Sequence, residues 1–253
     1  MTPDALLFVI SQYNLSARKF GQLSASLAAA CPLPSALVRL EGNGPNLPDA
    51  LDALRDAGRR TILVQPVGIP FTESLFAWLP GAMAHWLQQD GNGEISLALG
   101  KDLAGLQPVI GSAVEAALAG ADDAAPVNGA KPSLGKPGWQ TPPDFAHHLL
   151  VCTGPRCHFR DTASLLHTLK DETARQGIAS ECLTARTGCL FPCNQGPVVA
   201  LYPKGEWYRL PDSEAVTRFV SQVLVAGKTL PDLLVHTAKS TRIAPPKTEV
   251  TLP

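Results

Sequence analysis

Four cysteines in the C-terminal half of the chain form two closely spaced pairs. Four residues separate Cys152 from Cys157, and three separate Cys189 from Cys193. Each pair lies in a Gly- and Pro-containing loop directly after a predicted strand. Such a loop can bring two thiolates to one place and turn backbone N–H groups toward an anion. Five of the six cysteines lie between positions 152 and 193, and in a cytosolic protein this clustering indicates metal or redox chemistry rather than structural disulfides.

The spacing of the two pairs suits a [2Fe–2S] cluster, in which each iron takes two thiolates. Arg156 and Arg160 flank Cys157. Their charge, together with the N-terminus of the helix that follows, would hold an anionic cluster and raise its reduction potential. A zinc site with four cysteines is one alternative, although it usually has tighter turns and a single metal ion. A regulatory dithiol or disulfide is another. We expect Cys31 and Cys182 to be small apolar residues of the interior.

The elements that must position these loops follow a β-α-β-β-β-α order. Apolar runs and helical spacing predict a strand, a helix, a second strand, a hairpin and a final helix, over residues 149–151, 161–169, 177–183, 198–209 and 212–223. The first cysteine pair then follows the first strand, and the second pair follows the second strand.

The whole pattern resembles the thioredoxin-like [2Fe–2S] ferredoxins over residues 147–228. Beside the cysteine pairs, the matching segments are 187–190, 196–199 and the hairpin 202–208. The resemblance implies a thioredoxin-like fold in which the cluster is held by Cys152, Cys157, Cys189 and Cys193. One departure begins at His158, where relatives often have a glycine before the helix. We expect this departure to alter a turn rather than the ligation.

The N-terminal half alternates predicted strands and helices. Strands are predicted over residues 6–11, 36–40, 61–65 and 95–99, and helices over 16–31, 47–57, 79–87 and 103–118. Alternation through short loops indicates a flavodoxin-like α/β domain with a parallel sheet and helices on both faces. Ligands bind such sheets at the carboxyl ends of the strands, so the loops after the first three strands would surround any site.

Segments 41–47, 58–60, 64–67 and 100–103 resemble the small tetrapyrrole metal chelatases, the sirohydrochlorin cobalto- and ferrochelatase-like proteins. The resemblance covers about residues 5–118. In that family, His side chains after the first and third strands hold the incoming metal ion. The corresponding positions here are Ser11 or Gln12, and Ser74 beside Glu73. Amides and hydroxyls are poor ligands for Co²⁺ or Fe²⁺, so the resemblance implies a degenerate chelatase cleft without the metal chemistry.

Composition predicts the domain boundaries and excludes some partners. We expect a chelatase-like α/β domain over residues 1–120, a flexible linker over 121–145, a ferredoxin domain over 146–230 and a loose tail over 231–253. Residues 1–143 carry 9 basic and 12 acidic side chains, and 144–253 carry 12 and 10, so neither half has the basic surplus of a nucleic-acid binder. No apolar run is long enough for a membrane span. The first residues lack the basic region of a signal peptide, so we expect a cytoplasmic protein.

These features predict a [2Fe–2S] ferredoxin-type one-electron carrier, linked to tetrapyrrole or cobalamin metabolism through the chelatase-like domain. The expected partners are a redox protein, a tetrapyrrole or corrinoid, and a second copy in a homodimer; no nucleic acid and no membrane is expected. One alternative is an active chelatase that inserts cobalt or iron and whose cluster is structural or regulatory. Another is a metal or redox sensor without turnover.

Overall fold

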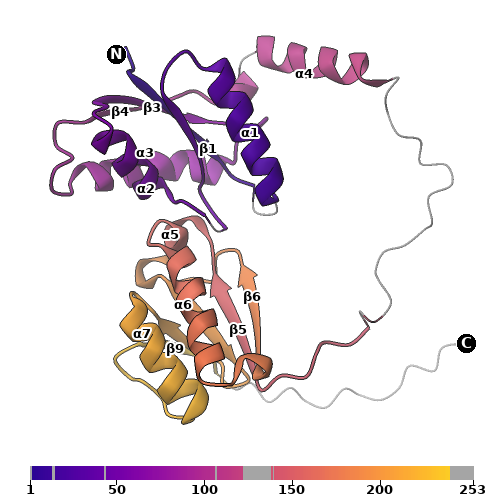
Figure 1. The fold of residues 1–253 in the computed structure, drawn as a ribbon, viewed down its shortest axis with the longest axis vertical. Helices are drawn as coiled ribbons and strands as arrows, with labels where there is room; N and C mark the ends of the chain where they lie inside the picture. Colours follow the sequence, from indigo (N-terminus) through magenta and orange to yellow (C-terminus); the bar gives the residue numbers. More distant parts are fainter. Residues whose placement is uncertain are drawn as a thin grey trace, which may run out of the picture.

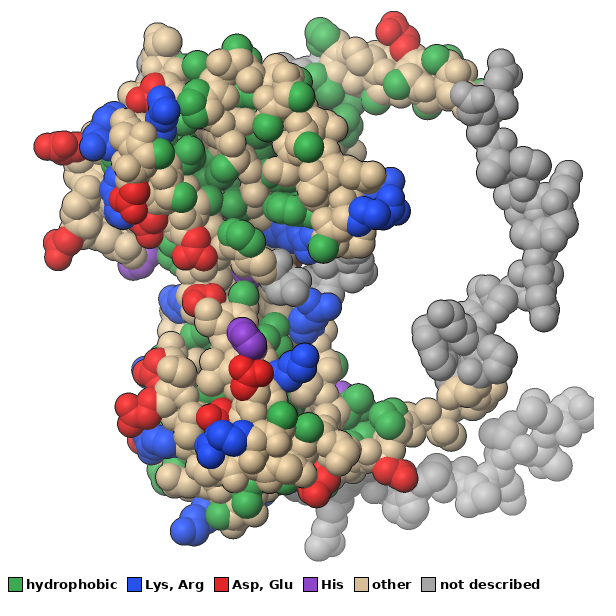
Figure 2. Space-filling view, viewed as in Figure 1, with side chains coloured by type: hydrophobic (Ala, Val, Ile, Leu, Met, Phe, Trp, Pro, Cys, Tyr) green, Lys and Arg blue, Asp and Glu red, His purple; other side chains and the backbone are tan. Residues whose placement is uncertain are grey.

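The computed structural model describes residues 2–12, 15–42, 44–105, 107–121, 138 and 140–239. The chain forms two lobes (Figure 1, Figure 2), each built on its own sheet. We call residues 2–121 the N-terminal lobe and residues 140–239 the C-terminal lobe. Most of the predicted linker (122–137 and 139) and of the predicted tail (240–253) lies outside the described residues.

The N-terminal lobe contains a four-stranded parallel sheet with the strand order β2-β1-β3-β4. Its strands are β1 (Ala5–Ile10), β2 (Ser35–Arg39), β3 (Thr61–Pro66) and β4 (Ser96–Leu99). Its helices are α1 (Ala17–Ala30), α2 (Leu47–Asp56), α3 (Glu73–Leu87), the 3-10 turn η1 (Leu103–Gly105) and α4 (Gln107–Ala119). This order confirms the predicted α/β fold with a parallel sheet.

Helix α3 begins earlier than the sequence indicates. The prediction starts at residue 79, whereas the helix begins at Glu73 and contains Pro80 in its interior. An interior proline removes one helical hydrogen bond and disfavours a helix. Here the same helix places Leu75 and Leu79 in the core of the lobe, and the burial of this apolar face outweighs the cost of the proline.

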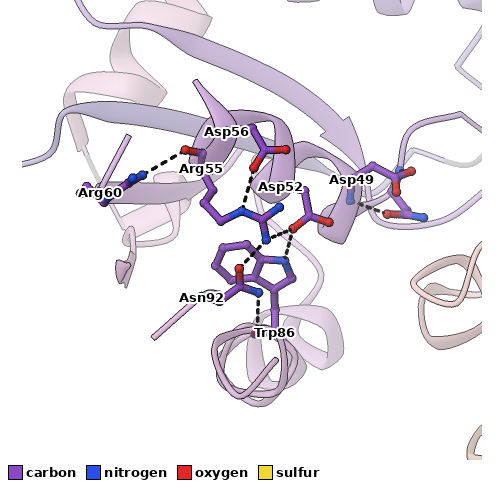
Figure 3. A network of polar contacts seen from close by, with 8 residues as sticks. Asp49, Asp52, Arg55, Asp56, Arg60, Trp86 and Asn92 are labelled. Atoms are coloured by element: carbon purple, nitrogen blue, oxygen red, sulfur yellow. Dashed lines mark hydrogen bonds and ion pairs between the residues drawn. The ribbon is translucent and has the colours of Figure 1, made fainter. Parts of the chain in front are cut away.

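A network of polar contacts fixes α3 against α2 (Figure 3). Trp86 Nε1 donates to Asp52 Oδ1 at 3.2 Å, and Arg55 Nη1 contacts the same carboxylate oxygen at 2.7 Å. Arg55 Nη1 also donates to Asn92 Oδ1 at 2.6 Å, and Asn92 Nδ2 donates to the carbonyl of Trp86 at 2.8 Å. Because Trp86 and Asn92 are fully buried, these bonds satisfy interior polar groups and hold α3 in one position.

The C-terminal lobe contains a mixed five-stranded sheet with the order β6-β5-β7-β8-β9. Only β5 and β6 are parallel; the other neighbouring strands are antiparallel. The strands are β5 (His147–Cys152), β6 (Cys182–Thr187), β7 (Val198–Tyr202), β8 (Glu206–Arg209) and β9 (Leu234–Thr237). The helical elements are α5 (Pro155–His158), α6 (Thr162–Arg175), the 3-10 turns η3 (Ala179–Glu181) and η4 (Cys193–Gln195), α7 (Ser213–Arg218) and its π-helical continuation η5 (Phe219–Val225).

Two features of this lobe differ from the sequence expectation. The second strand begins at Cys182 rather than near 177, because Gly177 turns the chain with a φ of 74° and residues 179–181 form a 3-10 turn. The tail predicted from residue 231 contains β9, which pairs with β8. Leu230 and Leu233 are buried in the core of the lobe, so this segment belongs to the folded sheet.

The two lobes meet where strands of both sheets end. The backbone N–H of Gly42, after β2, donates to the carbonyl of Thr153, after β5, at 2.9 Å. Phe159, at the end of α5, packs against the core of the N-terminal lobe, and Figure 1 shows α5 at the junction. The cysteine-bearing loops therefore lie beside the edge at which the N-terminal sheet would bind a ligand. Among the described residues, no helix has both the length and the apolar character needed to cross a membrane.

Candidate metal centre

The four cysteines come from two neighbouring strand ends. Cys152 is the last residue of β5 and Cys157 lies in α5, whereas Cys189 follows β6 and Cys193 begins η4. Since β5 and β6 are parallel and Cys152 pairs with Thr187 in register, both loops leave the sheet at the same edge. Cys152 and Cys157 are each 2% exposed, Cys193 is half-buried and Cys189 is exposed. The group thus has a buried pair and an outer pair.

The thiols within each pair are in contact, and the pairs lie close together. The Sγ atoms of Cys189 and Cys193 are 3.3 Å apart, and the thiols of Cys152 and Cys157 share a hydrogen bond. Cys193 also interacts electrostatically with both buried cysteines. The structure therefore brings all four predicted ligands together.

Contact between the thiols changes their acidity. The hydrogen bond from Cys157 lowers the pKa of Cys152 to about 6, because it stabilises the thiolate. The same hydrogen bond raises the pKa of Cys157, and burial raises it further. Burial is also the main cause of the raised pKa of Cys193. The remaining thiol protons are those that a bound metal would displace.

Two glycines allow the cysteine loops to approach each other. A Cβ atom at Gly154 would lie 3.1 Å from the backbone N and Cα of Cys189, and a Cβ atom at Gly196 would lie 2.6 Å from Cys157 Sγ. Real Cβ atoms essentially never approach another atom as closely as 2.6 Å. Because both positions are glycine, no side chain occupies the space between the loops or the space beside Cys157 Sγ.

Hydrogen bonds join the same two loops. Arg160 Nη1 donates to the carbonyl of Arg156 at 3.2 Å and to that of Cys193 at 3.0 Å, which connects the first loop to the second. The backbone N–H and the hydroxyl of Thr153 both donate to the carbonyl of Thr187, at 3.0 and 2.8 Å. The positions of the thiols are thus fixed by backbone contacts and by a cationic side chain.

The donor set fits a cluster with two metal ions. Within the described residues, no group of three or more His, Cys, Asp or Glu side chains is arranged around a single metal position. What the loops present is two pairs of soft sulfur donors, the set that a [2Fe–2S] cluster takes. The indole of Trp207 packs against the small buried cluster that contains Cys152, Cys157 and Val198. Its buried Nε1 has no partner among the described residues, so it is a free donor beside this group.

The predicted cleft of the N-terminal lobe has a different arrangement. Ser11 Oγ donates to Glu41 Oε1 at 2.7 Å, and Thr72 Oγ1 donates to Ser11 Oγ at 3.3 Å. Gln12 is exposed after β1, and Glu73 and Ser74 are exposed in the first turn of α3. The structure thus joins Ser11 to Glu41 and Thr72, which lie in the loops that were expected to surround a site. Their positions after β2 and β3 were the available signal.

The junction also contains residues whose burial was not predicted. His158 is 1% exposed, and burial lowers the pKa of its imidazole, opposed by the nearby backbone of Pro45 and Arg39. The ring of Phe159 lies 6.0 Å from those of Trp78 and His85 on α3. The segment that departs from the ferredoxin pattern is therefore part of the contact with the other lobe.

Comparisons with known proteins agree with the cysteine pattern. No family model matches the chain. The 2Fe-2S ferredoxin of Clostridium pasteurianum is 29% identical over 97 residues, which are 35% of this chain and 95% of the ferredoxin. The solved thioredoxin-like [2Fe–2S] ferredoxin of Aquifex aeolicus is 26% identical and covers 38% of this chain and 94% of its own, with a TM-score of 0.35.

A second solved structure, the CbiX protein assigned to cobalamin (vitamin B12) biosynthesis in Marinobacter aquaeolei, is 15% identical. It covers 48% of this chain and 97% of its own, with a TM-score of 0.41. The chain is thus similar to [2Fe–2S] ferredoxins over a segment about as long as such a protein, which confirms the resemblance found in its sequence.

Proposed function

We propose that this protein binds a [2Fe–2S] cluster through Cys152, Cys157, Cys189 and Cys193 and transfers one electron at a time. The observation that carries the proposal is the meeting of two thiol pairs, from two loops held together by Arg160 and kept free of side chains at Gly154 and Gly196. The similarity to a 2Fe-2S ferredoxin supports the same cofactor. When bound, the cluster supplies the one-electron chemistry.

The residues around the thiols set access and charge. Cys152 and Cys157 are buried and keep water from one side of the site, while the exposed Cys189 faces solvent. The outer pair is therefore the side at which a redox partner protein exchanges electrons. Arg156 and Arg160 place positive charge beside the site, and this charge favours the reduced, more negative cluster.

We also propose that the N-terminal lobe binds a tetrapyrrole or corrinoid without inserting a metal. The resemblance to small chelatases supports the ligand class, and the oxygen atoms of Ser11, Glu41 and Thr72 occupy the strand-end position. Hydroxyl groups are poor ligands for Co²⁺ and Fe²⁺. The test is a cobalt-insertion assay with sirohydrochlorin beside a binding titration with the same compound. Binding without insertion is expected, and insertion would establish the chelatase alternative instead.

The electron-transfer function is tested by a coulometric titration of the anaerobically purified full chain. We expect reversible uptake of one electron per chain in the native protein and in a Cys182→Ala variant, whose replaced thiol lies outside the four. A Cys189→Ala variant should take up none reversibly. Irreversible uptake, or uptake that survives Cys189→Ala, would contradict the proposal.

A further inference from the structure

A cavity of about 210 Å³ lies at the junction of the lobes. One wall belongs to α3, and the other belongs to the two cysteine-bearing loops. The lining residues are Trp78, Gly81, Ala82, His85, Arg156, Phe159, Arg160 and Asn194. Since Arg156 precedes Cys157 and Asn194 follows Cys193 directly, the cavity borders both pairs of predicted ligands.

The side chains that line this cavity favour an anion. Arg156, Arg160 and His85 are among them, whereas none of the described lining residues is Asp or Glu. Arg160 is held in place by its two bonds to the carbonyls of Arg156 and Cys193, and both bonds use Nη1. A guanidinium has five N–H donors in a planar fork, so Arg160 remains able to bind a carboxylate or phosphate group.

The aromatic side chains of the lining, one from each wall, favour a flat, unsaturated molecule. The rings of Trp78 and Phe159 meet edge to face, with centroids 6.0 Å apart and an interplanar angle of 82°. The guanidinium of Arg156 lies over the Trp78 ring, 5.7 Å from its centroid. Aromatic side chains bind flat rings by stacking or edge contacts, and arginine binds oxyanions through charge-assisted hydrogen bonds. The cavity places aromatic side chains and arginines in the same site.

We propose that this cavity binds an organic anion with a flat unsaturated part, whose carboxylate or phosphate group lies on Arg156 and Arg160 and whose flat part lies against Trp78. Both lobes contribute to the site, so a bound molecule would hold them together. The inference rests on the proposed function in one respect: the bound molecule lies beside a cluster only if the four cysteines hold one.

The test is isothermal titration calorimetry on the anaerobically purified full chain. The probes are naphthalene-2-carboxylate and 2-naphthyl phosphate, with the uncharged naphthalene-2-carboxamide as the control compound. We expect saturable binding of at least one anion at one site per chain, and no measurable binding of the amide. The tighter of the two anions identifies which acidic group the site prefers. Equal binding of the amide, or no binding of either anion, would overturn the inference.

Three variants locate the binding. Arg156→Gln should weaken it by at least about tenfold, the effect of losing a hydrogen bond between charged groups. Gly81→Leu keeps the charges but fills the cavity, and a Cβ atom there meets nothing within 4 Å; leucine also favours a helix more than glycine does. The Gly81→Leu variant should fold normally and bind neither anion. The matched control Arg175→Gln, at the far end of α6, should bind as the native chain does.

Binding that is unchanged in Gly81→Leu would place the molecule elsewhere and overturn the inference. Iron and sulfide are measured on the same samples. Samples that contain the cluster but bind neither anion would refute the cavity site and leave the proposed function standing. Samples that bind an anion but contain no cluster would support the cavity site and refute the proposed function.

Discussion

The two strand-end edges that meet at the lobe junction carry opposite kinds of donor atom. The edge of the C-terminal lobe presents four thiols, two of them buried. The edge of the N-terminal lobe presents the hydroxyls of Ser11 and Thr72 and the carboxylate of Glu41. Both folds bring loops together at such an edge, so the fold supplies the place and the residue types decide the chemistry. Soft-metal chemistry is thus expected on one side of the junction only.

The largest effect should come from removing one buried sulfur donor. A Cys157→Ala variant should lose the cluster completely, because each iron needs both thiolates of its pair. Cys182→Ala, which removes a half-buried thiol of the same lobe, should retain it. The measurement is iron and sulfide content with the visible spectrum. Equal loss of the cluster in both variants would contradict the assignment of the four paired cysteines, and not Cys182, as its ligands.

A smaller effect is expected from crowding the same sulfur atom. Gly196→Ala places a Cβ atom 2.6 Å from Cys157 Sγ, so something must shift, at a cost of about 1–3 kcal/mol. Iron content should fall below that of the native protein but stay above that of Cys157→Ala. Gly188→Ala is the matched control, since a Cβ atom there meets nothing within 4 Å. Full iron content in Gly196→Ala would contradict the close approach of the loops.

Charge beside the site should act on the reduction potential rather than on cluster content. Arg160→Gln removes a positive charge and a hydrogen bond to the carbonyl of Cys193, so the reduction potential should fall. Arg160→Lys retains the charge and should lower it less. A redox titration followed by electron paramagnetic resonance measures both, with Arg175→Gln as the distant control. A potential that is unchanged in Arg160→Gln would mean that the arginine lies too far from the cluster to act on it.

The smallest effect should come from the oxygen-lined edge. Ser11→Ala removes the 2.7 Å hydrogen bond to Glu41 and should lower the free energy of unfolding by about 1 kcal/mol. Urea unfolding followed by circular dichroism measures this change. Iron content and reduction potential should stay at native values. Lower iron content in Ser11→Ala would show that the two edges depend on each other.

The parts of the structure that local sequence patterns determine were predictable. The cysteine spacing identified all four thiols that the structure brings together, and an apolar run identified β5. The predicted second strand overlaps β6 only at Cys182 and Leu183. The early start of α3 was missed because Pro80 disfavours a helix locally, and only the burial of Leu75 and Leu79 outweighs it. The strand β9 was missed because its pairing with β8 is visible only in the folded sheet.

Contacts between distant segments could not be derived from the sequence. The bond between Ser11 and Glu41 depends on how β1 and β2 are aligned. The burial of His158 depends on the other lobe, which no local periodicity reports. Long-range packing of this kind explains why the residues of the junction, and the cavity between the lobes, emerged only from the structure.

The most direct test of the account is the iron and acid-labile sulfide content of the anaerobically purified chain, with electron paramagnetic resonance after reduction by dithionite. About two irons and two sulfides per chain, and a reduced-state signal of one unpaired electron, are the expected result. Zinc without sulfide would contradict it, because the cysteine pairs would then be structural and the proposed electron transfer would have no cofactor.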